Sequence, residues 1–221
     1  MAIDEWLLEQ HCCGKELPCL RFYTWEPIAI SLGYHQRHHP EYWHDLWWKS
    51  QKVDLVRRPS GGRAVLHQGD LTYSLIMSSC RGRRRDIYRY LCSFLIDGWQ
   101  SLGIELQLGT ERRYERSTNC FGSSTVADLV TNSGYKVIGS AQLYRNGGLL
   151  QHGSMRLNPN PALHKKVFGT ELISPVALAR IEQADIIQAL VKAAQKIFGI
   201  KLSIQPLLPQ EKAQAIRWIT R

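Results

Sequence analysis

Three strand-like segments separated by very short turns, all between residues 126 and 157, constrain the fold more than any other part of the chain. The turns read NSG at residues 132–134 and NGG at residues 146–148. Asn-Gly is the strongest short-range signal for a β-hairpin. Strands joined by hairpins pair antiparallel, so these turns predict at least part of an antiparallel sheet.

Two segments carry apolar residues at spacings of three and four, the pattern of a helix that buries one face. In residues 86–102 this apolar face is continuous, and Gly103 follows it as a stop signal. Residues 181–198 repeat the pattern. Shorter helices are expected over residues 2–11, 41–50 and 210–219.

The remaining strand candidates are short apolar runs bounded by turn residues. They cover residues 20–25, 28–32, 54–56, 71–77, 104–108 and 201–205. Strands and helices do not alternate regularly, which argues against a doubly wound fold. The chain shows no repeat, linker or low-complexity tract. We therefore predict an α+β fold, a single catalytic domain over residues 1–221, with a mixed, mostly antiparallel sheet flanked by helices.

Neither a membrane segment nor an export signal is expected. No run approaches about 18 apolar residues, the length of a membrane-spanning helix. The first ten residues, MAIDEWLLEQ, carry acids in place of the basic start of a signal peptide. A cytoplasmic protein is the resulting expectation.

Disulfides and metal sites are not expected either. The cysteines stand at positions 12, 13, 19, 80, 92 and 120, without a CxxC spacing. Most of these thiols should be small buried apolar groups, and Cys92 fits this because it falls within the helix of residues 86–102. His35, His38 and His39 lack partners at ligand spacing, so we interpret them as surface residues.

The formal net charge of +9 indicates an acidic partner. Nucleic acid and an acidic protein explain it equally well, and charge alone does not choose between them. The densest basic cluster is Arg81, Arg83, Arg84 and Arg85. Taken alone, such a cluster is more often a solvated loop.

A glycine pair with flanking basic residues lies between two of the strand candidates, within residues 57–63, here called the glycine loop. Gly61 and Gly62 let the backbone bend so that N–H groups can point at a ligand. The flanking polar residues are Arg57, Arg58, Ser60 and Arg63. A glycine pair alone indicates only a tight turn, but three arginines favour a loop that holds a phosphate, a carboxylate or a polarised carbonyl. No Gly-Lys-Ser/Thr follows, so it is not a Walker loop.

Residues 57–67, RRPSGGRAVLH, resemble without a gap the signature loop of the lipoate-protein ligase and octanoyltransferase family, which is related to the biotin protein ligases. Three other segments agree. Residues 1–10 resemble the family's opening helix, residues 20–36 its first hairpin, and residues 136–155 its Lys-x-x-Gly-Ser-Ala-Gln strand and the strand after it. The resemblance covers about residues 2–157 in order.

The resemblance implies a biotin/lipoyl ligase-like fold with an acyl chain in a tunnel beneath the glycine loop. It also implies that Lys136 reaches the acyl carbonyl, where an ammonium stabilises developing negative charge. Taken alone, Lys136 would be interpreted as an exposed strand lysine. The implied substrate-binding residues are Arg57, Arg58, Ser60, Gly61, Gly62, Arg63, His67, Gly139, Ser140, Ala141 and His152. His67 and His152 either orient loops or assist a proton transfer.

Within the family, residues 119–130 resemble the segment of the cysteine-dependent (LipM-type) octanoyltransferases that carries their nucleophile, which aligns with Cys120. A thiolate can take an acyl group from a thioester and pass it to an amine. A lone cysteine is otherwise more often a buried structural thiol. Residues 123–127 depart from the pattern usual in those enzymes, and the acid appears as Asp128, which predicts an altered loop shape or specificity.

The resemblance therefore implies an octanoyltransferase without cofactor or metal. Its donor would be octanoyl-acyl carrier protein, and its acceptor a lysine of the glycine-cleavage H protein or of an E2 lipoyl domain, with no role for nucleic acid or membrane. The short stretch after Asn158 favours this over a ligase with an accessory domain. The alternatives are an ATP-dependent lipoate or biotin ligase, an octanoyl amidotransferase that also uses Cys120, and a basic nucleic-acid-binding module or inactive adaptor.

Overall fold

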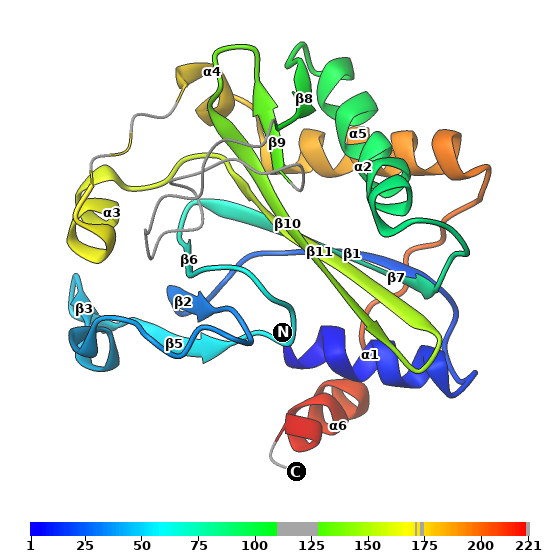
Figure 1. Cartoon of the computed structure of the whole chain (residues 1–221), viewed down its shortest axis with the longest axis horizontal. Helices are drawn as coiled ribbons and strands as arrows, with labels where there is room; N and C mark the ends of the chain where they lie inside the picture. Colours follow the sequence, from blue (N-terminus) through cyan, green and yellow to red (C-terminus); the bar gives the residue numbers. More distant parts are fainter. Residues whose placement is uncertain (110–127, 171, 173–174, 220–221) are drawn as a thin grey trace.

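The computed structural model describes residues 1–109, 128–170, 172 and 175–219. Its largest feature is a sheet of six strands, here called the main sheet (Figure 1). The strands are β1 (Cys19–Tyr23), β7 (Asp70–Ser78), β8 (Leu106–Leu108), β9 (Asp128–Thr131), β10 (Lys136–Arg145) and β11 (Gly148–Arg156). They lie in the order β1-β7-β11-β10-β9-β8, and every neighbouring pair is antiparallel.

The two predicted hairpins are confirmed as β9–β10 and β10–β11. In the second turn Asn146 and Gly147 both have positive φ, 49° and 78°. A two-residue type I′ turn needs this conformation at both central positions, which is why Asn-Gly predicts it.

Helices cover both faces of the main sheet, and this explains why β11 is buried along its whole length. Leu149 packs into the core under α2 (Arg84–Ser101) and α5 (Gln183–Phe198). Leu150, the next residue, packs into a separate core under α1 (Ala2–Cys12), to which Ala215 of α6 (Pro209–Ile219) also contributes. Successive strand residues point to opposite faces, so one strand serves two cores.

A second sheet of three strands, here called the small sheet, lies beside the main sheet (Figure 1). Its central strand β2 (Ala29–Leu32) runs parallel to β5 (Asp54–Arg57) and antiparallel to β6 (Val65–His67). Trp43, on the 3-10 helix η1 (Glu41–Asp45), is fully buried in its core. The two-stranded ribbon of β3 (Trp47–Trp48) and β4 (Gln51–Lys52) and the helix α3 (Pro161–Phe168) complete this region.

The predicted α+β class with mostly antiparallel pairing is confirmed, and the one parallel pair among the described strands lies in the small sheet. The predicted first hairpin within residues 20–36 is wrong, because β1 pairs with β7 while β2 belongs to the small sheet. The burial of the two strands explains the difference. β2 is buried at all four residues and needs a partner on each side, whereas β1 is half-buried and forms the edge of the main sheet.

Other differences are local. Residues 201–205 form no strand, and Ile204 is fully exposed, so its apolar character did not indicate burial. The expected helix over residues 41–50 is reduced to η1, and its second half becomes β3. The expectations missed β6, α3 and α4 (Val176–Ala179). For α3 a signal was available, because Asn160 caps the Leu163 N–H and Gly169 ends the helix at positive φ.

None of the helices in the described part of the chain is long and apolar enough to cross a membrane.

Candidate active site

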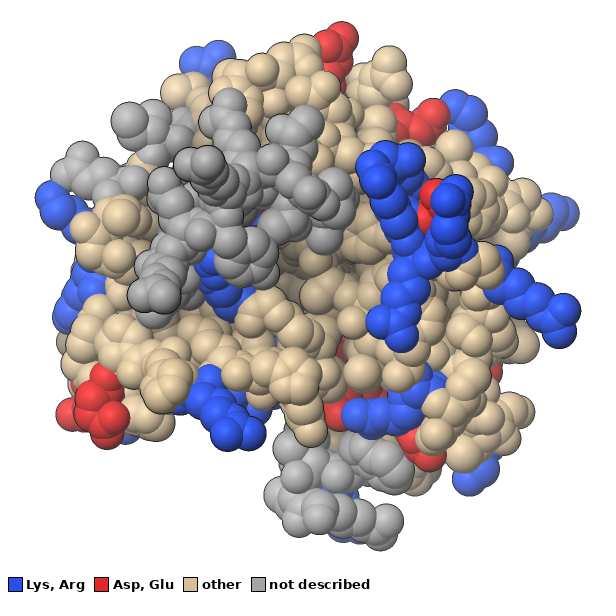
Figure 2. Space-filling view, viewed as in Figure 1, with Lys and Arg blue, Asp and Glu red and all other residues tan. Residues whose placement is uncertain are grey.

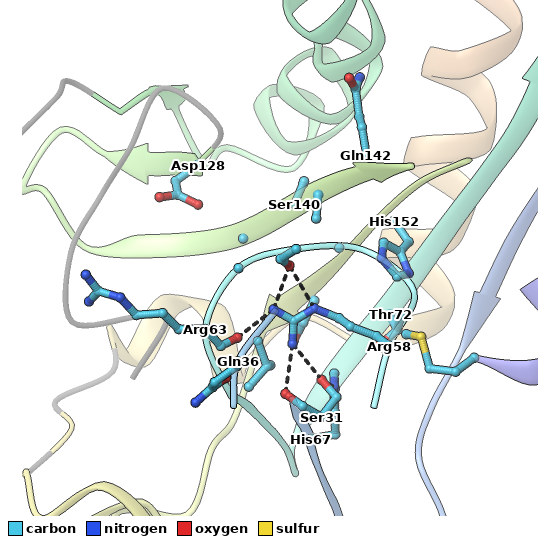
Figure 3. Close-up of a pocket in the computed structure, with 18 of the residues that line it drawn as sticks. Ser31, Gln36, Arg58, Arg63, His67, Thr72, Asp128, Ser140, Gln142 and His152 are labelled. Atoms are coloured by element: carbon cyan, nitrogen blue, oxygen red, sulfur yellow. Dashed lines mark hydrogen bonds between the residues drawn. The ribbon is translucent and has the colours of Figure 1, made fainter. Parts of the chain in front are cut away.

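A cavity of about 560 Å³ lies beneath the glycine loop, against β10 and β11 of the main sheet (Figure 3). This volume is typical of sites for small molecules and cofactors. Of the predicted residues, the cavity is lined by Arg58, Gly61, Gly62, Arg63, His67, Lys136, Gly139, Ser140, Ala141 and His152. Ser31, Gln36, Thr72, Asp128 and Ser154 also line it, and none of these was among the predicted site residues.

Arg58 holds the glycine loop in place from inside. Its buried guanidinium donates to the carbonyl oxygens of Ser31 at 2.8 Å, Gly61 at 3.0 Å and Arg63 at 2.5 Å (Figure 3). Gly62 sits directly against this guanidinium with φ at 97°, and a Cβ there would lie 2.8 Å from Arg58 Nη2. The second glycine of the loop is therefore required by both backbone conformation and space.

Arg57, expected among the substrate-binding residues, contacts the backbone outside the cavity. It is exposed, is not among the residues that line the cavity, and donates to the carbonyl oxygens of Gly33 at 2.8 Å and Gln36 at 2.9 Å. These contacts fix the segment after β2, on which the glycine loop rests. A Cβ on Gly33 would lie 1.8 Å from the carbonyl oxygen of Gly62, so Gly33 permits this close approach. The predictions missed Gly33, although a glycine directly after a buried strand is a signal for close backbone contact.

Ser60 and His152 join the glycine loop to the main sheet. The Ser60 Oγ lies 2.5 Å from the Nε2 of His152, and both side chains are buried. Burial lowers the pKa of His152 to about 4, while the nearby Asp4 carboxylate acts in the opposite direction. The imidazole is therefore neutral at neutral pH.

Lys136 is buried, which corrects the view of it as an exposed strand lysine and agrees with a role inside the cavity. Its Nζ lies 2.8 Å from Asp128 Oδ1, and both side chains line the cavity. The register of β9 against β10 shifts between Lys136 and Ile138, and such bulges re-aim side chains next to functional sites. The pairing with Asp128 joins the start of β9 to the start of β10. No signal in the sequence indicated that Asp128 pairs with Lys136.

The backbone of β10 and β11 passes close along the cavity at Gly139, Ser140, Ala141 and Gly153. A Cβ on Gly153 would lie 2.6 Å from Ser140 Oγ and 2.7 Å from the Gly139 carbonyl oxygen. The hydroxyl of Tyr73 donates to Ser140 Oγ at 2.8 Å. Small residues here let a ligand approach the strands themselves.

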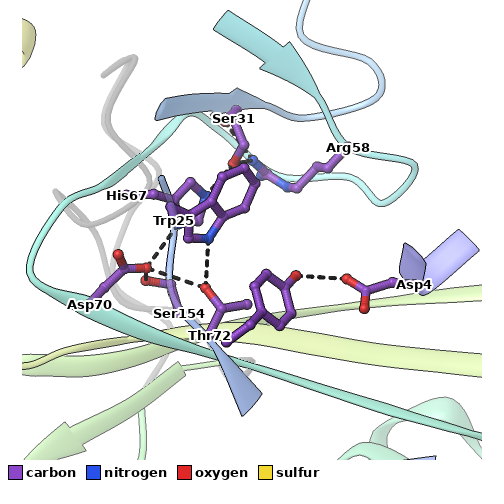
Figure 4. Close-up of polar contacts among 9 residues, drawn as sticks. Asp4, Trp25, Ser31, Arg58, His67, Asp70, Thr72 and Ser154 are labelled. Atoms are coloured by element: carbon purple, nitrogen blue, oxygen red, sulfur yellow. Dashed lines mark hydrogen bonds and ion pairs between the residues drawn. The ribbon is translucent and has the colours of Figure 1, made fainter. Parts of the chain in front are cut away.

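His67 contacts two polar side chains at once. Its Nε2 lies 2.8 Å from Ser31 Oγ and its Nδ1 lies 2.8 Å from Asp70 Oδ2 (Figure 4). All three residues are buried, and Ser31 and His67 line the cavity. This agrees with a site role for His67, whereas Ser31 and Asp70 carried no signal in the sequence.

Cys120, the predicted nucleophile, lies outside the described residues. Among the described cysteines, burial raises the pKa of Cys92 to about 12 and that of Cys19 to about 11, so neither thiol ionises readily. In the parts of the chain that are described, no three His, Cys, Asp or Glu side chains are grouped to hold a metal ion.

Comparison with known proteins gives two kinds of match. Residues 1–192 match the family described as the lipoyl protein ligase A/B catalytic domain. The chain is 38% identical over 170 residues to the octanoyltransferase LipM of Brevibacillus brevis, which covers 72% of this chain and 61% of that protein. It is 40% identical over 166 residues to the octanoyltransferase LipM of Clostridioides difficile, covering 72% and 60%. The chain thus spans about three fifths of the length of these curated relatives.

Solved structures show the same fold. Lipoate-protein ligase A bound with ATP superposes with a TM-score of 0.78 at 21% identity, covering 100% of this chain and 88% of that one. A bi-partite lipoate protein ligase from Thermoplasma acidophilum, studied together with its E2 lipoyl domain, gives 0.71 at 20% identity, covering 100% and 86%.

Proposed function

The chain belongs to the lipoyl protein ligase A/B catalytic-domain family, and from this premise we propose that it is a cytosolic octanoyltransferase. Residues 1–221 act as one catalytic domain. The enzyme moves an octanoyl group from acyl carrier protein to Cys120 and then to a lysine of a lipoyl domain. The observation that carries the proposal is the identity of 36–40% to relatives named octanoyltransferase LipM. The cavity supports it with a clamped glycine loop facing a buried lysine.

In the first half-reaction the Cys120 thiolate attacks the carbonyl carbon of the donor thioester. A new C–S bond forms, the bond to the donor sulfur breaks, and the donor leaves as a thiol. Negative charge develops on the carbonyl oxygen, and the Lys136 ammonium is the cation proposed to stabilise it. Asp128 keeps that ammonium in one orientation, because it pairs with Lys136 at 2.8 Å. The arginines of the glycine loop add positive charge that favours the thiolate.

In the second half-reaction a lysine ε-amine attacks the acyl-cysteine and an amide forms. The acceptor is the glycine-cleavage H protein or an E2 lipoyl domain. Support comes from the structural relative that was studied with its own E2 lipoyl domain. Basic side chains also gather over the start of α2, where an acidic carrier could dock (Figure 2). Neither nucleic acid nor a cofactor takes part.

The test is intact mass after incubation with octanoyl-acyl carrier protein in the absence of ATP. The wild type should gain one octanoyl mass on Cys120, and hydroxylamine should remove it. Cys120→Ser should gain none, while Cys92→Ser should load normally. Lys136→Ala should load roughly 10²–10³-fold more slowly, the usual loss for one oxyanion donor. An absolute need for ATP with free octanoate as donor would overturn the proposal.

An ATP-dependent lipoate ligase is the second candidate, because the fold neighbours include a ligase bound with ATP. In that case the glycine loop would hold an adenylate, and loading would fail without ATP. An octanoyl amidotransferase is a variant of the leading proposal, since it also uses Cys120. It would load from an octanoylated lipoyl domain in preference to acyl carrier protein, and the same mass experiment with that donor distinguishes the two.

A further inference from the structure

The side chains of Ser31, His67 and Asp70 form a continuous hydrogen-bonded line that ends at the cavity (Figure 4). We propose that this line, here called the relay, removes the proton from the acceptor lysine when its amine attacks the acyl-enzyme. Ser31 contacts the amine, His67 takes the proton, and Asp70 positions His67. The inference rests on the proposed function.

The hydrogen bonds assign the direction of the relay. Asp70 Oδ2 is the common acceptor of three contacts: His67 Nδ1 at 2.8 Å, the Ser154 hydroxyl at 2.7 Å and the Thr72 hydroxyl at 3.4 Å. A carboxylate in this setting places the imidazole proton on Nδ1. Nε2 of His67 is then an acceptor, so the Ser31 hydroxyl donates to it at 2.8 Å.

The oxygen of Ser31 is left ready to accept. Arg58 Nη1 donates to Ser31 Oγ at 3.2 Å, and Ser31 lines the cavity. A proton that reaches this oxygen from an attacking amine displaces the hydroxyl proton onto His67 Nε2. The resulting imidazolium is stabilised by Asp70, as in the serine–histidine–aspartate arrangement of hydrolases. Here the serine conducts a proton, because the acyl group already resides on a cysteine.

The protons and bonds of the step balance. The lysine nitrogen forms a C–N bond to the acyl carbon and gives up a proton to Ser31, whose own proton passes to His67. The C–S bond to Cys120 breaks and the thiolate leaves. The imidazolium then returns its proton to the solvent or to the thiolate, which restores the resting enzyme.

Stacking and two hydrogen bonds fix the orientation of the His67 ring. The indole of Trp25 stacks on the imidazole with 4.0 Å between ring centroids, and its Nε1 donates to Thr72 Oγ1 at 2.9 Å. Packing therefore prevents rotation of the ring away from Ser31. The titratable and charged groups near the relay come from four elements: His152 of β11 lies near His67, Arg58 of the glycine loop contacts Ser31, and Tyr23 of β1 lies near Asp70 of β7.

Other groups of the cavity suit this step less well. A neutral lysine amine gains positive charge as its C–N bond forms, and it must lose a proton before the C–S bond breaks to leave an amide. His152 is a weak base, since burial lowers its pKa to about 4, and its Nε2 faces Ser60. Asp128 is paired with Lys136. His67 faces Ser31 with one ring nitrogen and Asp70 with the other, each at 2.8 Å, and this geometry favours it as the base.

The experiment isolates the second half-reaction. Acyl-enzyme is prepared from octanoyl-acyl carrier protein, freed of donor, and mixed with a lipoyl domain in a single turnover followed by intact mass. Ser31→Ala breaks the relay but leaves Arg58 its three carbonyl acceptors, and His67→Asn retains a donor toward Asp70. The loading rate of each variant is measured separately, so that the transfer step is compared on acyl-enzyme that is already formed. Both variants should transfer the octanoyl group to lysine about 10²-fold more slowly, within the usual range for lost general-base catalysis. Ser93→Ala, on the opposite side of the main sheet in α2, should match the wild type in both steps.

Two readouts separate proton removal from a merely structural role. Hydroxylamine is a small nucleophile that cleaves thioesters without an enzyme base, so it should cleave the acyl-enzymes of both variants at the wild-type rate. In a plot of the logarithm of the transfer rate against pH, the wild type should show two slopes separated by a bend. Ser31→Ala should show a single slope. Transfer at the wild-type rate in both variants, or an equal loss with hydroxylamine, would overturn the relay alone. An octanoyl group mapped to Ser31 would also overturn it. A wild type that never loads would overturn the proposed function and this inference with it.

Discussion

At the scale of single residues, the two glycines of the glycine loop differ in what they permit. Gly62 has φ at 97° and sits against Arg58, whereas a Cβ on Gly61 would meet no atom within 4 Å. Gly62→Ala should therefore lower the free energy of unfolding by at least about 1–2 kcal/mol, the cost of a left-handed conformation for alanine. Gly61→Ala should change it by less than about 1 kcal/mol. Urea denaturation measures both, and equal losses would show that the loop conformation described here is wrong.

The buried histidine on β11 gives a prediction about pH. The pKa of His152 in the folded protein, about 4, lies below the ordinary value of 6.5. Between these values the unfolded chain binds more protons, so stability falls as pH falls from 6.5 toward 4. His152→Gln, which cannot take up a proton, should lose less stability over this window, by roughly 3 kcal/mol in total. Denaturation curves at pH 7 and pH 4.5 measure this, and parallel losses in both proteins would contradict it.

At the scale of secondary-structure elements, α2 and β11 meet around Cys92. This thiol is fully buried and accepts from the Gln151 amide at 3.6 Å. Cys92→Ser replaces it with a hydroxyl in an apolar interface, which should cost about 1–3 kcal/mol. Acyl loading should be unchanged, because Cys92 belongs to the helix packing and burial raises its pKa to about 12. Thermal denaturation and the mass assay measure the two effects, and loss of loading at unchanged stability would give Cys92 a role in the chemistry.

At the scale of the whole molecule, the basic cluster named in the sequence lies at the beginning of α2, where Arg81, Arg83, Arg84 and Arg85 are all exposed (Figure 2). Positive charge at the N-terminal end of a helix opposes the helix dipole, so these arginines do not stabilise α2 through it. The proposed docking of an acidic carrier would give them a role.

Replacing Arg83, Arg84 and Arg85 with serine should raise the KM for octanoyl-acyl carrier protein more than it lowers kcat. The effect should fade at high salt, because the Debye length falls from about 10 Å at 0.1 M to about 3 Å at 1 M. The matched control replaces the exposed Lys192, Lys201 and Lys212 with serine. This removes the same number of positive charges from other parts of the surface. Steady-state kinetics of both triple variants measure this difference. Equal changes in the two variants would show that the cluster acts only through its contribution to the net charge.

The features that could be predicted from the amino-acid sequence are those that depend on a few neighbouring residues. The Asn-Ser-Gly and Asn-Gly turns predicted the hairpins β9–β10 and β10–β11, and apolar spacing identified α2 and α5. The glycine loop and Lys136 were found through their resemblance to a family, and the cavity contains both. These signals are local, because turn conformation and helix periodicity are set within a few residues.

Which residues far apart in the chain come into contact depends on the tertiary structure. Ser31 and His67 are 36 residues apart in the chain, and Ser60 and His152 are 92 apart. The first pair forms because β2 and β6 pair antiparallel in the small sheet, and the second because the glycine loop packs against the main sheet. No local pattern specifies either contact. Tertiary packing also gives the two neighbouring arginines different contacts. Arg57 donates to backbone carbonyl groups after β2, whereas Arg58 lies inside the glycine loop. The same packing also turns Lys136 from an exposed strand residue, as its neighbours in sequence suggest, into a buried ammonium paired with Asp128.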